Sequence, residues 1–276
     1  MSLPAALQEI HEWRGVEGLV AAEVLTDNDT DGYTTGDVFA IAGVAEISRQ
    51  TDSANEAHYY DNIPAIVVSS TSADEVTINT SAIPLDVYAE ITGQTYDADT
   101  GALIEGPRDV KYFAIGYITQ KENGDPVYVW RYKGTFNIPS QTNSTINDGT
   151  DANGQELTYT GISTTHKFTK TGKGAKSLNV DVAKQLANVD NFFDEVVTPD
   201  TLAAKTSYSL TITQAAGTTV TVKRGNVALA TGATIYSGDV LTISVTGGTV
   251  TVNSTAFISG NMHVVTGNVA VVSTAS

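Results

Sequence analysis

KYFAIGYITQK (residues 111–121) and VYVWRYKGTFNI (residues 127–138) are two long stretches separated by only five residues. Both are rich in aromatic and β-branched side chains, which favour strands. The connection contains Asn123-Gly124, and this pair is common in tight hairpin turns because both residues tolerate positive φ. The stretch therefore predicts a β-hairpin of two long strands at the centre of a mainly β fold.

The second of these strands has two distinct faces. Successive side chains of a strand point to opposite sides, so every second residue shares a face. One face is expected to carry Tyr128, Trp130, Tyr132 and Gly134, and the other Val127, Val129, Arg131 and Lys133. Aromatic side chains in such a row are typical of core or interface packing.

The segments around this hairpin show further strand and helix patterns. Strands are predicted over residues 18–26, 39–49, 75–80 and 156–169. A short helix is expected at residues 84–91, with Pro84 in its first turn and Gly93 at its end. A second helix is expected within residues 180–196, where Val182, Leu186, Val189 and Phe193 follow helical spacing. Residues 1–17 are interpreted as an N-terminal arm, and residues 50–72 as a long loop without clean alternation.

The amino-acid composition and the predicted strand length change near residue 206. Short Thr- and Val-rich strands separated by glycine turns follow to the end, which favours a small β-sandwich. The charge changes too: the chain up to residue 202 carries 30 acids and 12 bases, whereas residues 203–276 carry one acid and three bases. We therefore expect two domains, at residues 1–200 and 206–276.

Composition excludes several classes of protein. The 276 residues include no cysteine, so disulfides, thiolate metal sites and a cysteine nucleophile are all excluded. No apolar run is long enough to cross a membrane as a helix. The N-terminal residues do not resemble a signal peptide, which predicts synthesis in a cytoplasm. The net charge of −16 opposes binding to nucleic acid, because such binding needs Lys and Arg side chains.

Catalytic motifs are missing from the sequence. The four histidines lack the spacing of a metal site, and no G-x-S-x-G motif is present. TGKGAKS (residues 171–177) fails as a phosphate-binding loop, because Ala175 and Lys170 stand where the motif requires glycine. We expect no enzymatic activity and no cofactor. A hydrolase that acts through paired carboxylates stays an alternative, since sequence does not give their separation.

Asp27, Asp29 and Asp31 form the one candidate metal site. They alternate and are followed by Gly32, as in the first half of a calcium-binding loop. The twelfth position should be Glu but is Val38, and the flanking segments read as strands. An ordinary acidic turn is therefore the stronger interpretation, with calcium binding as the alternative.

Residues 18–193 resemble the major tail proteins, or tail tube proteins, of bacteriophages with long, non-contractile tails. The resemblance depends on the order and pattern of several segments rather than on a catalytic signature. Those segments are AGVAEI (42–47), YYD (59–61), residues 85–93, YDADTGALIE (96–105), residues 112–139 with YVWRYKG (128–134) above all, and LTYTG (157–161).

This resemblance implies a tail-tube β-barrel or sandwich with a flanking short helix. It also implies hexameric rings that stack into a tube in the virion, through which DNA passes without sticking. The implied partners are further copies of the chain, the tape measure protein, and the tail terminator and baseplate proteins. Residues 206–276 resemble the immunoglobulin-like appendages of phage tails.

Two groups of residues are expected to make contacts between subunits. Tyr59, Tyr60 and Ile63 lie in the 50–72 segment, which together with the N-terminal arm is suited to reach the next ring. Tyr128, Trp130 and Tyr132 form the aromatic strand face. The rival hypothesis is a surface adhesin or carbohydrate-binding protein with two β-domains, in which Tyr and Trp side chains stack on sugars.

Overall fold

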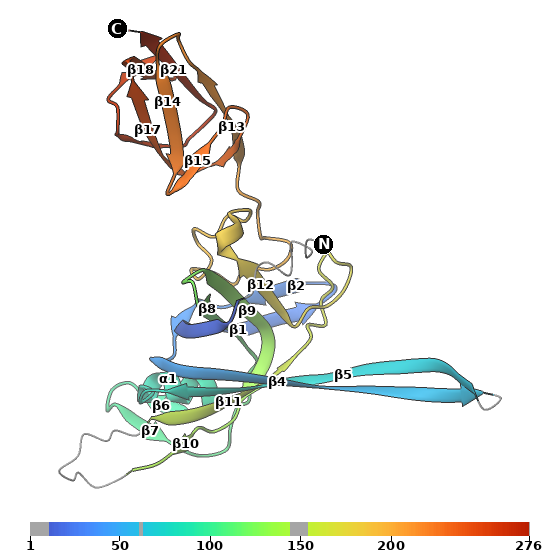
Figure 1. Cartoon of the computed structure of the whole chain (residues 1–276). Helices are drawn as coiled ribbons and strands as arrows, with labels where there is room; N and C mark the ends of the chain where they lie inside the picture. Colours follow the sequence, from blue (N-terminus) through green and yellow to red (C-terminus); the bar gives the residue numbers. More distant parts are fainter. Residues whose placement is uncertain (1–10, 61–62, 144–153, 276) are drawn as a thin grey trace. The chain divides into compact units, whose positions relative to one another are not determined.

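The computed structural model describes residues 11–60, 63–143 and 154–275 (Figure 1). The chain divides into two compact units. The first comprises Met1–Lys184 and Val189–Leu202, and the second Gln185–Asn188 and Ala203–Ser276. The fold is mainly β, as the sequence predicts. No helix in the described part of the chain has the length and apolar character needed to cross a membrane.

One large antiparallel sheet organises the first unit. Its main path, within the described residues, runs β2 (Gly32–Thr35), β1 (Trp13–Asn28), β8 (Phe113–Lys121), β9 (Pro126–Phe136), β11 (Gln155–Ile162), β5 (Ile63–Thr80) and β4 (Val44–Tyr60). Three short strands attach beside it: β3 (Phe39–Ala40) on β1, β10 (Ser140–Gln141) on β11, and β12 (Ser177–Asp181) on β9. The predicted central hairpin is confirmed as β8 and β9, which pair across the Asn123-Gly124 turn.

The predicted short helix is confirmed as α1 (Leu85–Thr92). It ends at Gly93, which has a φ of 68° and whose amide donates to the Ala89 carbonyl. A β-carbon at Gly93 would lie 2.0 Å from the carbonyl oxygen of Asp109, so only glycine fits this close approach. The hairpin of β6 (Thr95–Asp97) and β7 (Ala102–Ile104) follows the helix.

The core of the first unit lies against one face of β5, β8 and β11. The apolar side chains of these strands and of α1 pack together there, as alternation within each strand requires. Its buried members include Ile78, Tyr88, Phe113, Ile115, Phe136, Leu157 and Tyr159.

Two predictions for this unit were wrong. Residues 50–72 are not a loop, because β4 and β5 pair along most of this segment. Residues 180–196 do not form a helix. They begin with the end of β12 and a 3-10 turn at Val182–Lys184, and then run through turns past Phe192.

Smaller differences concern strand ends. The first strand begins at Trp13, inside the segment that was expected to be an arm, and β11 ends at Ile162 rather than residue 169. The expected strand over residues 39–49 is split into β3 and β4. Residues 1–10 of the predicted arm lie outside the described residues.

The second unit has two sheets around one apolar core. One sheet runs β16 (Thr234–Tyr236), β13 (Ser207–Thr213), β21 (Val269–Ala275), β18 (Gly248–Val252) and β19 (Thr255–Phe257). The other runs β15 (Val227–Leu229), β14 (Thr219–Arg224), β17 (Val240–Thr246) and β20 (Met262–Val264). Leu210, Ile235, Leu241, Ile243 and Val271 are fully buried between them.

Candidate assembly site

The β4–β5 hairpin is the most extended feature of the first unit. β5 pairs with β11 only from Asp74 to Thr80, opposite Gly161 to Gln155. Beyond Asp74 the two hairpin strands continue to pair with each other, from Ser53 opposite Thr71 to Tyr60 opposite Ile63. No third strand joins this outer part among the described residues, and it extends away from the rest of the unit (Figure 1).

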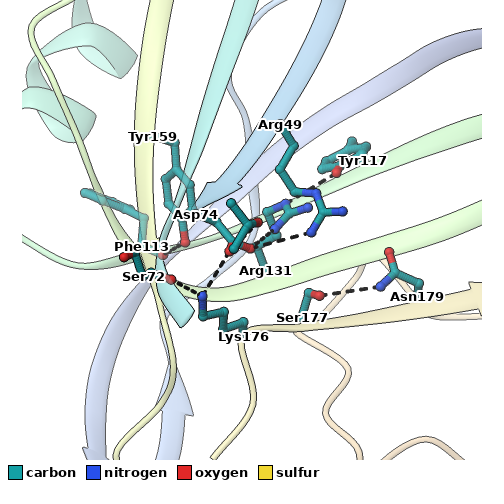
Figure 2. Close-up of polar contacts among 11 residues, drawn as sticks. Arg49, Ser72, Asp74, Phe113, Tyr117, Arg131, Tyr159, Lys176, Ser177 and Asn179 are labelled. Carbon is teal, nitrogen blue, oxygen red and sulfur yellow. Dashed lines mark hydrogen bonds and ion pairs between the residues drawn. The ribbon is translucent and has the colours of Figure 1, made fainter. Parts of the chain in front are cut away.

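Asp74 anchors the hairpin where it leaves the sheet. Arg131 of β9 donates from Nη1 to Asp74 Oδ2 at 2.8 Å, and Lys176 donates from Nζ to Asp74 Oδ1 at 3.0 Å (Figure 2). The Thr51 hydroxyl of β4 donates to Oδ1 at 2.9 Å. Lys176 also donates to the Ser72 carbonyl. Both hairpin strands are therefore tied to β9 and to the segment before β12.

The carboxyl of Asp74 is held in its charged form. Burial by itself would raise its pKa, but the hydrogen bonds from Lys176 and Thr51, with the charges of Lys176 and Arg131, outweigh burial and lower the pKa below 3.8. Arg49 of β4 adds a third cation, with Nη1 4.0 Å from Oδ2. Three cations therefore surround one carboxylate, and this end of the sheet has an excess of positive charge.

The opposite side of the same strands is polar and lacks cations. The residues that alternate with the core residues on β4, β5 and β11 are direct partners across the sheet. They carry carboxylates, hydroxyls and amides, and we call them the carboxylate–hydroxyl face. Its members are Glu46, Ser48, Gln50, Glu75, Thr77, Asn79, Glu156, Thr158 and Thr160.

The expected aromatic face of β9 lies inside the unit. Trp130 and Tyr132 are both 0% exposed. The Trp130 indole donates to the Phe192 carbonyl at 2.8 Å, and the Tyr132 hydroxyl donates to the Val197 carbonyl at 3.1 Å. Tyr128, which is half-buried, packs its ring against Phe192. Trp130 and Tyr132 thus offer no surface to another subunit, because the 189–197 segment covers them.

The expected row on this face is also interrupted. The pairing of β8 with β9 shifts between Phe113 opposite Gly134 and Ile115 opposite Arg131. Between these two pairs β9 has one residue more than β8. Side chains of β9 on either side of this bulge therefore alternate out of phase, and those beyond it point to the opposite side of the sheet. Gly134 consequently lies against the Tyr159 ring in the core, on the other side from Trp130.

Of the other three expected contact residues, Ile63 is strongly exposed. Its side chain is 65% exposed at the outer end of the hairpin. Tyr59 and Tyr60 lie in the paired part of β4, with Tyr60 opposite Ile63. The structure therefore brings these three residues together at the hairpin end and separates them from the aromatic face of β9.

The three aspartates proposed for calcium have other partners. Asp27 pairs with Lys133 and accepts the amides of Thr165 and His166. Burial would raise its pKa, yet the Lys133 and amide hydrogen bonds hold it below the usual value. Asp29 accepts the Lys167 amide, and Asp31 accepts from Asn28.

These aspartates close a turn and fix the 165–167 segment, so the ordinary acidic turn describes them better than a calcium loop. Among the side chains that the structure describes, no group of three is suited to hold a metal ion.

The Asp74 cluster has no signal in the sequence. Asp74 and Arg131 lie 57 residues apart, and Lys176 lies in the 171–177 segment, to which the sequence assigned no function. The single hint in the sequence was Arg131, which lies among apolar residues in a predicted strand. A buried arginine requires a carboxylate partner, but sequence does not say which one.

Comparison with known proteins identifies the family. Residues 24–254 match the family model of the phage tail tube protein. No curated protein is significantly similar to the chain. The match does not stop at residue 193, where the resemblance was expected to end, but continues through β18 of the second unit. With most of its length matched, the chain belongs to the phage tail tube protein family.

Proposed function

We propose that this tail tube protein assembles into hexameric rings that stack into a hollow tube, and that the tube conducts DNA from the capsid to the host. The protein is made in the host cytoplasm and works in the virion. It performs no chemistry of its own. Its partners are further copies of the same chain, the tape measure protein, and the terminator and baseplate proteins at the tube ends.

The observation that carries this proposal is the outer part of the β4–β5 hairpin. It continues for about eight residues past the sheet, or roughly 26 Å at about 3.3 Å per residue. An isolated two-stranded hairpin is marginally stable in water, so it gains stability by packing on another surface. In a family of tube-forming proteins, the nearest such surface belongs to a neighbouring subunit.

The carboxylate–hydroxyl face supports the conduit. It includes Glu46, Glu75 and Glu156 and has no Lys or Arg among its members. Like charges keep phosphates away, and without cations there is no counterion release to favour adhesion. This face is suited to line the lumen, where DNA must move without binding.

The second unit is proposed to decorate the outside of the tube as an immunoglobulin-like domain. It has its own core, and residues 203–276 carry three bases and one acid. It therefore does not share the acidic character that suits a wall around DNA.

Electron microscopy of the purified protein tests the proposal. We expect tubes or stacked rings with six-fold symmetry, with tail initiators added where the free subunit is slow to nucleate. A protein that stays monomeric at high concentration with initiators present contradicts it. Charge reversal by Glu75→Lys and Glu156→Lys tests the lumen: we expect the variant tubes, and not the wild type, to retain DNA.

A further inference from the structure

A groove lies between β4 and the strands β1, β8 and β9. Its cavity volume is about 660 Å³. Val16, Ile47, Tyr117, Val127 and Val129 give it an apolar lining, and all five belong to the core of the unit or pack against it. Trp13 stands at the groove with its side chain 68% exposed. Of these five residues, Tyr117, Val127 and Val129 are buried, whereas Val16 and Ile47 are partly exposed in the groove.

The groove arises because the sheet forks at β9. The first half of β9, from Val127 to Arg131, pairs with β12, and the second half, from Lys133 to Phe136, pairs with β11. β11, β5 and β4 thus form a separate layer. In the part of the chain that the structure describes, β4 pairs only with β5. One wall of the groove, residues 45–49, therefore belongs to a strand with an open edge.

The polar end of the groove carries excess positive charge. Arg49 and Arg131 both line it with one carboxylate residue, Glu46, and Figure 2 shows the two arginines converging with Lys176 on Asp74. An occupant that places carboxylates near this end and apolar side chains along the lining would be complementary to the groove.

The end of the hairpin has this chemistry. YYDNIPAIVV (59–68) is mostly apolar and has one acid, Asp61; residues 50–72 as a whole add Asp52 and Glu56 and contain no Lys or Arg. Ile63 at this end is strongly exposed. Because the outer hairpin extends away from the body of its own unit, the groove that receives it must belong to another molecule (Figure 1).

We propose that the groove formed by β1, β4, β8 and β9 receives the end of the β4–β5 hairpin of a second copy of this chain. The inference rests on the proposed function, since it names the contact through which one subunit holds the next. The docked end covers Val16 and Ile47 and brings an acidic segment without Lys or Arg near Arg49. It also shields the open edge of β4, which is otherwise a site for uncontrolled pairing.

Thiol crosslinking tests this contact cleanly because the chain has no cysteine. Two single variants, Ile63→Cys and Val16→Cys, are mixed, assembled into tubes and treated with a short bismaleimide. Only a contact between two chains gives a covalent dimer in this mixture. The double variant Ile63→Cys/Val16→Cys is expected to give a ladder of multimers. The matched control pairs Ile63→Cys with Thr158→Cys on the carboxylate–hydroxyl face and is expected to stay uncrosslinked.

Each outcome is decisive. Tubes that crosslink through Val16 and not Thr158 support the contact. Tubes that form but crosslink through Thr158, or not at all, overturn it and leave the proposed function intact. A crosslink from Val16→Cys to Ser2→Cys in place of Ile63→Cys overturns it in favour of the N-terminal residues as the occupant.

A second variant tests the contact without crosslinking, in case the cysteine variants do not assemble. Val16→Trp fills the groove and is expected to abolish tubes while the monomer still unfolds cooperatively in urea, whereas Thr158→Trp assembles normally. Assembly of Val16→Trp at the wild-type rate overturns the proposal. If the wild-type chain itself forms no tubes, the proposed function fails, and this contact fails with it.

Discussion

Arg131 Nη1 lies 2.8 Å from Asp74 Oδ2, and both side chains are almost completely buried. The pair joins β9 to β5 at the residue where β5 loses its pairing with β11. A buried charge whose partner is removed is strongly destabilising, because the remaining charge has lost its solvent as well. This pair consequently holds the fork of the sheet and the base of the hairpin together.

We expect Asp74→Ala to lower the free energy of unfolding by about 3–5 kcal/mol, since Arg131 then remains buried without a carboxylate. Both tryptophans, Trp13 and Trp130, belong to the first unit, so their fluorescence during urea unfolding reports on that unit alone. Glu75→Ala, at the exposed neighbour, is the control and should change stability by no more than about 0.5 kcal/mol. Equal effects of the two substitutions would show that the pair does not hold the fork.

Acid should weaken the same anchor. The pKa of Asp74 is below 3.8 in the folded protein and near 3.8 in the unfolded chain, so the unfolded state binds the proton more readily. The stabilisation from Asp74 is therefore present above 3.8 and is lost as the pH falls through the lower native pKa. Asp27, whose pKa is also lowered, acts in the same direction.

The measurement compares wild type with Asp74→Asn by urea unfolding from about pH 6 to about pH 3. The stability difference between them is expected to be largest near pH 6 and to shrink below about pH 4, as the wild-type carboxyl becomes protonated. A difference that stays constant over this range would mean that the charge of Asp74 contributes nothing.

Gly134 is expected to tolerate no side chain. A β-carbon there would lie 2.4 Å from Tyr159 Cζ and 2.5 Å from the Thr160 carbonyl oxygen. Overpacking of this kind costs about 1–3 kcal/mol or more, because β9 and β11 must separate. Gly106→Ala is the matched control, since no atom lies within 4 Å of the position its β-carbon would take. Urea unfolding of the two variants should differ accordingly, and a Gly134→Ala protein as stable as Gly106→Ala would contradict the packing described for β9.

Substitutions at Tyr132 and at Ile63 should have different effects, the first on folding stability and the second on assembly. Tyr132→Ala removes a fully buried aromatic side chain and should cost about 3–5 kcal/mol in urea unfolding. Ile63→Ser makes an exposed side chain polar, so stability should stay within about 0.5 kcal/mol while tube formation, followed by electron microscopy, is slowed. If Tyr132→Ala were stable but unable to assemble, the aromatic strand would be a subunit contact after all.

The sequence predicted the elements with strong local signals. The Asn123-Gly124 turn, the alternating strands around it and the Gly93 helix end are all fixed by neighbouring residues, and each is present. The strands within residues 50–72 were not predicted, because the outer hairpin does not pack on the core of its own unit. Without a buried side, neither strand needs an alternating pattern.

The remaining failures have a tertiary cause. The 180–196 segment has apolar residues at helical spacing, but Phe192 and Val197 are positioned by the side chains of Trp130 and Tyr132, which they cover. Likewise, Asp74 meets Arg131 and Lys176 only because β5, β9 and the segment before β12 converge. Such contacts depend on topology, and no local pattern encodes them.

The two units should be separable at Lys205. Their apolar cores share no residue, and the Lys205 amide still donates to the Leu186 carbonyl in a chain that ends there. A protein of residues 1–205 is therefore expected to keep the wild-type urea midpoint in tryptophan fluorescence and to form tubes of the same bore with a smoother outline. A chain that ends at Lys184 also lacks the segment that covers Trp130 and Tyr132, and it should be strongly destabilised. If the 1–205 protein failed to assemble while keeping its midpoint, the second unit would be part of the subunit contact and not a decoration.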